Sequence, residues 1–359
     1  MKIGIISTYP PYKCGIAVAC TEKIVKEYEK EGHSVTVYSF KGYDYQANFV
    51  KPILDNRNPL SYIRAASLIS QARFDRLWIE YEYTFYNRLF FPFFLAMLRL
   101  HGVKTNLRMH TIVPYTDLLK GGLFKLYPSF MFLFVSRVFL QTEIARSKLL
   151  KLSFVRPAIS VIPLPIPLAA AKFGRHTIPH KGINLLLFGF ITSDKGIDIA
   201  IKAFGGVGRI FLNIVGSVNP RSMKKQFLYF DGIKRDVAGY RNITLVDRFV
   251  SEEEKLAFFA QADFILLPYR FIEQSAVLTE IWAMGKIPVS SDIPPLKEAL
   301  DGGRYGVLFK AEDKDDLRAQ VLSIAADKKR QEALLENIRS LVKERAFVKT
   351  VKKYLDEMA

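Results

Sequence analysis

The stretch FILLPYRFIEQSAVLTEIWAMGKIPVSSD, residues 264–292, decides how this chain folds. Its first four residues are apolar and favour a strand, which Pro268 ends. A polar loop follows, and from Ala276 apolar residues recur at helical spacing until Gly285 closes the helix. A second strand pattern begins at Ile287. This order predicts a parallel α/β unit in which the loop opens onto a helix N-terminus and suits an anionic ligand.

Short apolar runs recur along the whole chain, separated by helical patterns such as Ala17–Lys30 and Ile63–Gln71. Apolar runs without alternation are typical of parallel strands that are buried on both faces. The expected strands are Ile3–Ser7, Val35–Phe40, Leu77–Tyr81, Thr105–Met109, Val138–Gln141, Ile159–Leu164, Asn184–Phe190, Ile210–Val215, Ile243–Leu245, Phe264–Leu267, Ile287–Ser290 and Val307–Phe309. No sequence repeat links the two halves, but the same order of strands and helices recurs in both. We therefore expect two doubly wound, Rossmann-like units in tandem.

The chain has 359 residues, which is enough for two domains. A Pro-rich segment from Pro165 to His180 separates the two sets of strands. We therefore expect an N-terminal domain over residues 1–170 and a C-terminal domain over residues 171–340. Residues 341–359 are expected to form a closing helix.

The net charge is +17, and the excess of basic residues is uneven. Residues 1–168 contain 22 Lys and Arg against 11 Asp and Glu. A basic first half indicates an anionic partner, which is a nucleic acid, a nucleotide or an anionic membrane. The alternative is that a Lys-rich chain is simply more soluble.

The two cysteines, Cys14 and Cys20, do not make a disulfide framework and indicate a reducing compartment. The opening MKIGIIST is too short for a secretory signal and has the pattern of a strand. The longest apolar runs, Leu89–Leu98 and Leu126–Val135, span about ten residues each, half of what a bilayer requires. We therefore expect a soluble or peripheral cytoplasmic protein without a transmembrane helix.

Two more loops have the composition of phosphate-binding loops. The first, TYPPYKCGIA, ends a strand and contains Gly15, whose backbone amide can approach a phosphate without a side chain in the way. In the second, Lys195 precedes Gly196 at a helix start and offers a compact positive charge to a diphosphate. His110 follows a strand, at the edge of the sheet where ligands gather. The first loop lacks the G-x-G-x-x-G fingerprint, which argues against an NAD enzyme.

These stretches resemble the family 4 retaining glycosyltransferases, whose fold is GT-B: two Rossmann-like domains that face each other across a cleft. Glu280 matches the second Glu of the family's Glu-x7-Glu motif, and IWAMGKIPVSSD resembles the turn that follows it. The first Glu position falls on Ile272, with Glu273 one place later. A subgroup reads PYR and then QSG before the second Glu, and this chain has Arg270 and Ala276 there.

The resemblance implies roles in donor binding for Gly15, Lys195, Arg270, Ser275, Ala276 and Glu280. Glu280 would accept hydrogen bonds from the ribose, and the amides of the two loops would face the diphosphate. The family also has an Arg on the diphosphate, and that position is Phe190 here. Arg270 or Arg221 is expected to supply the missing charge.

The resemblance also implies catalytic roles for His110, Glu273 and Lys195. His110 would touch the transferred sugar and Glu273 would face it, whereas Lys195 would stabilise the leaving diphosphate. Glu82 occupies the place of an acidic residue in the family's motif after the third strand. A surface salt bridge would explain Glu82 equally well.

No cofactor and no metal are expected. Asp313-Lys314-Asp315 has the D-x-D form of a metal motif, but it precedes a helical pattern, so that Asp313 is better explained as an N-cap. No Cys/His cluster has zinc spacing, and no G-x-S-x-G or Walker motif is present.

The resemblance therefore implies a retaining hexosyltransferase that moves a sugar from a nucleotide-sugar to a hydroxyl acceptor. Two segments rich in Phe, Leu and basic residues, Phe85–Arg99 and Leu118–Phe132, have the composition of helices at a membrane interface. We expect a lipid-linked or membrane-presented glycan as the acceptor. The alternatives are a GT-B protein that has lost catalysis, a phosphorylase or nucleotide-sugar epimerase of the same fold, and a nucleic-acid-binding protein.

Overall fold

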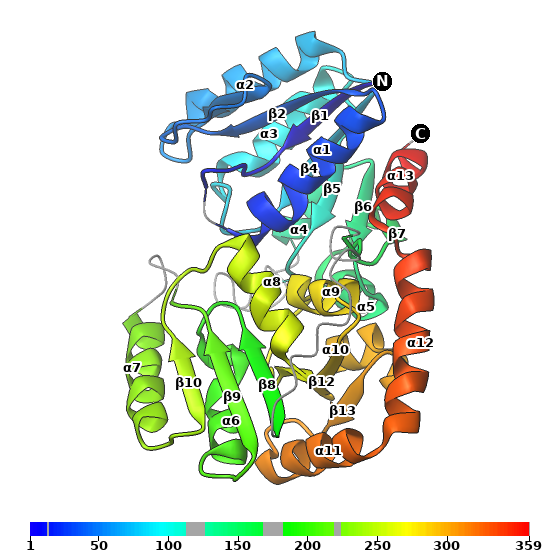
Figure 1. Ribbon diagram of the computed structural model, residues 1–359. Helices are drawn as coiled ribbons and strands as arrows, with labels where there is room; N and C mark the ends of the chain where they lie inside the picture. The colour runs from blue at the N-terminus through cyan, green and yellow to red at the C-terminus, as the bar shows by residue number, and fades with distance from the viewer. Residues whose placement is uncertain (13, 113–125, 168–181, 219–223, 359) are drawn as a thin grey trace. The chain divides into compact units, whose positions relative to one another are not determined.

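A computed structural model describes residues 1–12, 14–112, 126–167, 182–218 and 224–358 (Figure 1). The chain divides into two compact units. One contains Met1–Pro163 together with Val348–Ala359, and the other contains Leu164–Phe347. The division thus falls after Pro163 and after Phe347, where the sequence predicted boundaries after residues 170 and 340.

The first unit is built on seven parallel strands in the order β3-β2-β1-β4-β5-β6-β7. They are β1 (Lys2–Ile6), β2 (Ser34–Phe40), β3 (Val50–Leu54), β4 (Arg76–Tyr81), β5 (Asn106–Met109), β6 (Arg137–Leu140) and β7 (Ala158–Val161). The six strands expected in this half are present, whereas β3 was missed. Lys51 and Pro52 interrupt its apolar pattern, and a proline is tolerated there because β3 lies at the edge of the sheet.

Helices cover both faces of this sheet (Figure 1). They are η1 (Ile16–Thr21), α1 (Glu22–Lys30), α2 (Pro59–Ala72), α3 (Phe90–Leu100), α4 (Leu126–Phe132), α5 (Glu143–Leu152) and α13 (Phe347–Glu357). The expected helix Ala17–Lys30 is two elements, because η1 is a π-helix that passes into α1. Helix α13, at the end of the chain, packs on the first unit, where Tyr354 donates a hydrogen bond to the Ile162 carbonyl (3.1 Å).

The second unit has six parallel strands in the order β10-β9-β8-β11-β12-β13. They are β8 (Ile183–Phe188), β9 (Ile210–Val215), β10 (Ile243–Val246), β11 (Phe264–Leu267), β12 (Ile287–Ser291) and β13 (Val307–Phe309), so that every strand expected in this half is present. The helical elements are η5 (Ser193–Lys195), α6 (Ile197–Phe204), α7 (Lys224–Ala238), α8 (Glu252–Gln261), α9 (Ala276–Ala283), α10 (Pro294–Ala299), η6 (Asp301–Gly303), α11 (Lys314–Ala326) and α12 (Lys328–Glu344).

Both sheets have the strand order of a doubly wound fold. In the first, β1 pairs with β2 on one side and β4 on the other, and in the second, β8 pairs with β9 and β11 in the same way. The strand order therefore reverses between β1 and β4, and between β8 and β11. Ligands of such sheets bind outside the carboxyl ends of the strands at these reversal points. The predicted loops after β1, β8 and β11 all lie at these ends.

Candidate active site

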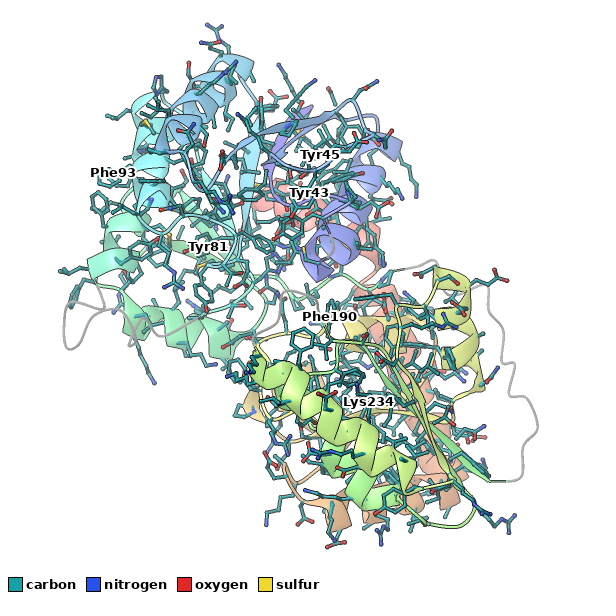
Figure 2. All side chains as sticks on the ribbon, turned by 90° about the vertical axis from the view of Figure 1, so that its left-hand side faces the viewer. Tyr43, Tyr45, Tyr81, Phe93, Phe190 and Lys234 are labelled. Carbon is teal, nitrogen blue, oxygen red and sulfur yellow. The ribbon has the colours of Figure 1, made fainter. Side chains whose placement is uncertain are left out.

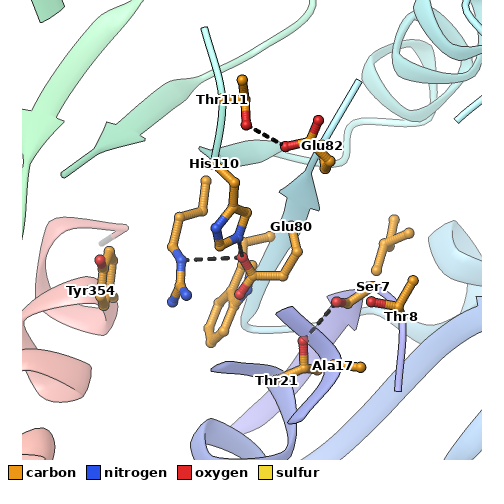
Figure 3. A network of polar contacts seen from close by, with 12 residues as sticks. Ser7, Thr8, Ala17, Thr21, Glu80, Glu82, His110, Thr111 and Tyr354 are labelled. Carbon is orange, nitrogen blue, oxygen red and sulfur yellow. Dashed lines mark hydrogen bonds and ion pairs between the residues drawn. The ribbon is translucent and has the colours of Figure 1, made fainter. Parts of the chain in front are cut away.

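The glycine loop of the first unit joins β1 to η1. Gly15 is exposed at the N-cap of η1, and a side chain added there would meet no atom within 4 Å. Thr21 on η1 is hydrogen-bonded to Ser7 at the end of β1 (Oγ1 to Oγ, 2.7 Å; Figure 3). This bond ties the π-helical turn to the strand, and π-turns of this kind are frequent at functional sites. The structure therefore leaves open space at Gly15, as a phosphate contact would require.

His110 lies in a buried cluster of charged side chains (Figure 3). Its Nε2 is 2.6 Å from Glu80 Oε2, and the Arg108 Nε is 3.1 Å from the same oxygen. Burial alone would raise the pKa of Glu80, but Arg108 and His110 hold it below its ordinary value. Because the Glu80 carboxylate is ionised, it accepts the hydrogen bond and the His110 Nε2–H donates it. This contact fixes the tautomer and the orientation of the imidazole.

Arg108 completes this cluster on the side of the C-terminal helix. Its side chain is 2% exposed and its guanidinium lies 5.2 Å from the ring centroid of Tyr354 on α13. Burial would lower the pKa of Arg108, but Glu80 raises it above its ordinary value. A guanidinium buried to this degree depends on Glu80 for its balancing charge. Sequence analysis missed both residues. Their signal is that Glu80 and Arg108 are charged residues inside otherwise apolar strands, β4 and β5.

Among the residues that the structure describes, Glu82 takes part in no ion pair at the surface. Instead it accepts a hydrogen bond from the Thr111 hydroxyl (2.6 Å; Figure 3). Burial raises the pKa of Glu82 above its ordinary value. Thus β4 ends in two carboxyl groups with opposite shifts. The structure brings Glu82 and His110 to the same edge of the sheet, as the sequence predicted.

Lys195 is on the tight turn between β8 and α6. Its ammonium group lies 3.9 Å from the ring centroid of Tyr269, and among the described residues it makes no ion pair. Burial lowers the pKa of Lys195 to about 8, with a smaller opposite effect from Asp194. The turn needs Gly196, whose φ is 62° and where a Cβ would clash with the Pro268 carbonyl. Within the described part of the chain, Lys195 is therefore a partly desolvated cation without an ion-pair partner, which suits a diphosphate.

Arg270 is held differently from what the sequence predicted. We expected it to meet the diphosphate in place of the missing Arg, but its guanidinium is engaged inside the second unit. It donates to Asp198, Glu312 and the Ser193 carbonyl at 2.7–2.9 Å. The forked geometry of Arg matches a carboxylate, and here that carboxylate is Asp198 rather than a ligand.

The loop after β11 leads into α9. Ser275 is the N-cap of this helix, and its Oγ accepts a hydrogen bond from the Leu278 amide (3.2 Å). Ala276 is therefore the first helical residue, and the amides of the first turn point out of the helix end. Glu273, two residues before the cap, is buried at the same edge of the sheet. The predicted loop residues are thus together, and their contacts with a donor stay predictions.

Glu280 is half-buried on α9 and has a partner that sequence analysis missed. The Lys255 ammonium group on α8 is 3.0 Å from Glu280 Oε1 and 2.8 Å from Glu252 Oε1. Burial would lower the pKa of Lys255, but these two carboxylates raise it above its ordinary value. Lys255 therefore orients the Glu280 carboxylate before any ligand arrives. No spacing rule in the sequence points to this pair, which are 25 residues apart.

Phe190 occupies the place where the family has an Arg, and it makes an edge-to-face contact with Phe249 (ring centroids 5.7 Å apart; Figure 2). Ile272, in the first Glu position, is partly buried against the core of the second unit. Arg221, the other proposed source of positive charge, lies outside the described residues. The structure thus assigns neither Arg270 nor Arg221 to the vacated position.

Asp313 is the N-cap of α11 as predicted, and its carboxylate accepts hydrogen bonds from the amides of Asp315 and Asp316 (3.1 and 3.0 Å). The described residues contain no group of three or more His, Cys, Asp or Glu side chains that could hold a metal ion. Cys14 and Cys20 are not joined by a disulfide. No helix in the described part of the chain is both long and apolar enough to cross a membrane.

The comparisons with known proteins agree with this geometry. Residues 182–327 match the family model described as "Glycosyl transferases group 1". Sucrose-phosphate synthase from Thermosynechococcus elongatus has a TM-score of 0.75, 13% identity and coverage of 99% of this chain and 98% of that chain. HepE from Anabaena, in complex with UDP and glucose, has a TM-score of 0.77, 13% identity and coverage of 99% and 98%. A trehalose-phosphate synthase from Burkholderia xenovorans has a TM-score of 0.76, 12% identity and the same coverage.

No curated protein matches the sequence. The two parallel sheets and the structural matches establish the GT-B fold, as the sequence predicted. Residues 182–327, which lie within the second unit, match the family model of group 1 glycosyl transferases, and the structural matches show the fold of the chain.

Proposed function

We propose that this glycosyltransferase moves a sugar from a uridine diphosphate-sugar to a lipid-linked or membrane-presented glycan. The transfer retains the anomeric configuration and uses no metal ion. The donor class is suggested by HepE, whose structure contains UDP and glucose. Retention is suggested by the resemblance of residues 264–292 to the retaining family.

The observation that supports this proposal most strongly is the state of Lys195. A cation that is partly desolvated, and makes no ion pair with a described residue, gains most from an anionic ligand. It stands at the carboxyl edge of β8, beside the reversal of strand order. The N-terminal turn of α9, which follows β11, adds backbone amides at the same edge. Together they would take up the charge of a leaving diphosphate without a metal.

Glu280 is suited to the ribose of the donor. Its carboxylate is oriented by Lys255 through Oε1, and a carboxylate is the group that best accepts hydrogen bonds from two neighbouring hydroxyl groups. In the first unit, the His110 Nε2–H is bound to Glu80, and this contact orients the imidazole at the carboxyl edge of the sheet. We assign His110 to the transferred sugar.

The membrane part of the proposal is supported by an exposed apolar patch on the first unit. The patch is centred on Phe93 of α3 and Phe130 of α4, and the exposed residues Leu89, Leu126 and Leu133 are on or beside the same two helices. The side chain of Phe93 is 56% exposed and lies at the outer edge of the unit (Figure 2), where its ring is 5.9 Å from that of Phe130. Large apolar side chains that gather on a surface are typical of an interaction site.

The charge next to this patch favours an anionic membrane over a protein partner. Arg64 on α2, Arg88 before α3 and Arg99 on α3 are all exposed. Each Lys or Arg near an anionic surface contributes about 1 kcal/mol to its binding. Part of the segment Leu118–Phe132, including Lys120, Gly121, Gly122 and Lys125, lies outside the described residues. The apolar side chains would enter the interface while the arginines contact the headgroups.

Two experiments test the proposal. The first is turnover of a panel of nucleotide-sugars in the presence of EDTA, with thermal stabilisation by UDP, ADP and GDP as a second readout. Turnover of a UDP-sugar that survives EDTA is expected; activity that needs added magnesium or manganese would contradict the proposal. A ligand at about 100 times its Kd stabilises a protein by roughly 2.7 kcal/mol. Thermal unfolding therefore detects binding of the nucleoside diphosphate even when the panel lacks the sugar that is transferred.

The second experiment is sedimentation with liposomes of anionic and of neutral lipid at low salt. We expect binding to anionic liposomes that is lost in the variant Phe93→Ser/Leu133→Ser. The matched control is Phe211→Ser, an exposed apolar residue of the second unit, which should bind as the wild type does. Negligible binding of the wild type to both lipids would leave a soluble acceptor as the better assignment.

A further inference from the structure

Arg270 is the centre of a set of contacts that we call the arginine clamp: Arg270 with Asp198, Glu312 and Ser193. Four of the five guanidinium N–H groups are used. Nη1 and Nη2 donate to the two carboxylate oxygens of Asp198 at 2.8 Å each, Nη1 also donates to the Ser193 carbonyl (2.9 Å), and Nε donates to Glu312 (2.7 Å). The clamp therefore has little capacity left for a ligand.

The clamp is supported from a further helix. The Tyr229 hydroxyl on α7 donates to Asp198 Oδ1 (2.8 Å). Burial alone would raise the pKa of Asp198, but Arg270 and Tyr229 hold it below its ordinary value. On the other side, Glu312 has a φ of 67°, a conformation that few non-glycine residues adopt. These partners fix the guanidinium in one place.

What the clamp holds is the turn that contains Lys195. Besides the Ser193 carbonyl bond, the Arg270 amide donates to the Asp194 carbonyl (2.8 Å). The Ser193 amide in turn donates to Gln226 on α7 (2.9 Å). Two consecutive carbonyls of the turn are thus bound to one arginine, directly before Lys195. Any shift of Arg270 would change where the Lys195 ammonium group points.

We propose that Arg270 is a positioning residue that holds the Ser193–Gly196 turn, so that Lys195 is already in place when the donor diphosphate arrives. This inference rests on the proposed function for the role of Lys195, but the clamp itself does not. It replaces the expectation that Arg270 binds the diphosphate directly. Pre-organised cations stabilise charge better than mobile ones, because no free energy is spent on orienting them during the reaction.

The test compares Arg270→Met, Arg270→Lys and Asp198→Asn with the control Arg248→Met. Arg248 makes two hydrogen bonds to Glu254 on the surface of the same unit. Its removal therefore breaks an arginine–carboxylate pair that does not contact the turn. The first readout is hydrogen exchange of the peptide over residues 190–197 in the free protein. We expect exchange about tenfold faster in all three clamp variants, and unchanged exchange in the control. Unchanged hydrogen exchange in Arg270→Met would show that Arg270 does not hold the turn and would overturn the proposal.

The second readout is the Kd for UDP. A positioning role predicts that Arg270→Met and Asp198→Asn each raise the Kd for UDP by about tenfold. The double variant should have no higher Kd, because each single change already breaks the arginine clamp. Arg270→Lys should not rescue binding, since an ammonium group cannot make the fork. Full rescue by Lys, or tighter binding in Asp198→Asn, would show that Arg270 contacts the diphosphate itself and would overturn the proposal. If the wild type binds no UDP, the proposed donor is wrong. In that case, hydrogen exchange of residues 190–197 by itself shows whether Arg270 holds the turn.

Discussion

The buried charges at the carboxyl edge are paired with one another in the first sheet, whereas Lys195 in the second sheet has no ion-pair partner among the described residues. In the first unit, Glu80, Arg108 and His110 are all buried, and the carboxylate binds both the Arg108 guanidinium and the His110 imidazole. In the second unit, Lys195 makes no ion pair among the described residues, although burial lowers its pKa to about 8. A cluster that is neutralised internally has a defined shape but little charge to offer. An uncompensated cation attracts an anion at the cost of stability.

This contrast separates two tasks of the proposed glycosyltransferase. The first unit presents one oriented imidazole, which suits a neutral hydroxyl group of a sugar. The second unit presents a positive charge, which suits a diphosphate.

Glu80→Gln should have the largest effect, and it should be on stability. The amide keeps a contact to His110 but leaves the Arg108 guanidinium buried without a balancing charge, which costs about 3–5 kcal/mol of unfolding free energy. Chemical denaturation measures this loss. Glu82→Gln is the matched control two residues away, and it should cost less than about 1 kcal/mol because it loses one hydrogen bond. Equal losses in both variants would refute the internal neutralisation of the cluster.

Lys195→Met should behave in the opposite way. Removing an uncompensated buried cation leaves the stability unchanged or higher, whereas kcat/KM for the nucleotide-sugar should fall by about a hundredfold or more. Steady-state kinetics and thermal unfolding of the same preparation give both values. A destabilised Lys195→Met protein with normal kcat/KM would place Lys195 among the structural residues.

His110→Ala should lower kcat by about tenfold, the cost of one hydrogen bond to the sugar, and leave the Kd for UDP near that of the wild type. The phosphate end of the donor is assigned to the other unit, so the two constants should separate. Turnover and calorimetric titration with UDP measure them. Parallel losses in both constants would indicate that His110 is structural only.

The smallest effect is expected from pH. Lys195 binds an anion only while it is protonated, and its pKa of about 8 means that protonation is lost as the pH rises through that value. Between pH 7 and pH 8.5 the protonated fraction falls from about nine tenths to about one quarter, so that the affinity for UDP should fall roughly fourfold. The titration is repeated with Lys195→Arg, which stays protonated and should show no such dependence. A wild-type affinity for UDP that does not change with pH would contradict the assignment of Lys195 as the cation that binds the diphosphate.

The sequence predicted most of the elements because their signals are local. The strands of both units are short apolar runs, and the N-cap at Asp313 is a short-range pattern that needs no knowledge of the rest of the chain. Strand β3 was missed because its burial depends on the neighbouring strand β2 rather than on its own composition. The split of the first helix into η1 and α1 has no signal in the sequence that we could identify.

By itself, then, the sequence determined the two Rossmann-like units and the loops at their carboxyl edges, and it predicted an anionic ligand for these loops. It did not determine which charges are paired. Glu80 meets His110 across 30 residues, Lys255 meets Glu280 across 25, and Arg270 meets Asp198 across 72. Only the tertiary structure decided that Arg270 is engaged by Asp198, while Lys195 makes no such pair with any residue that the structure describes. The physical reason is that an ion pair depends on which strands and helices become neighbours, and periodicity along the chain does not contain that information.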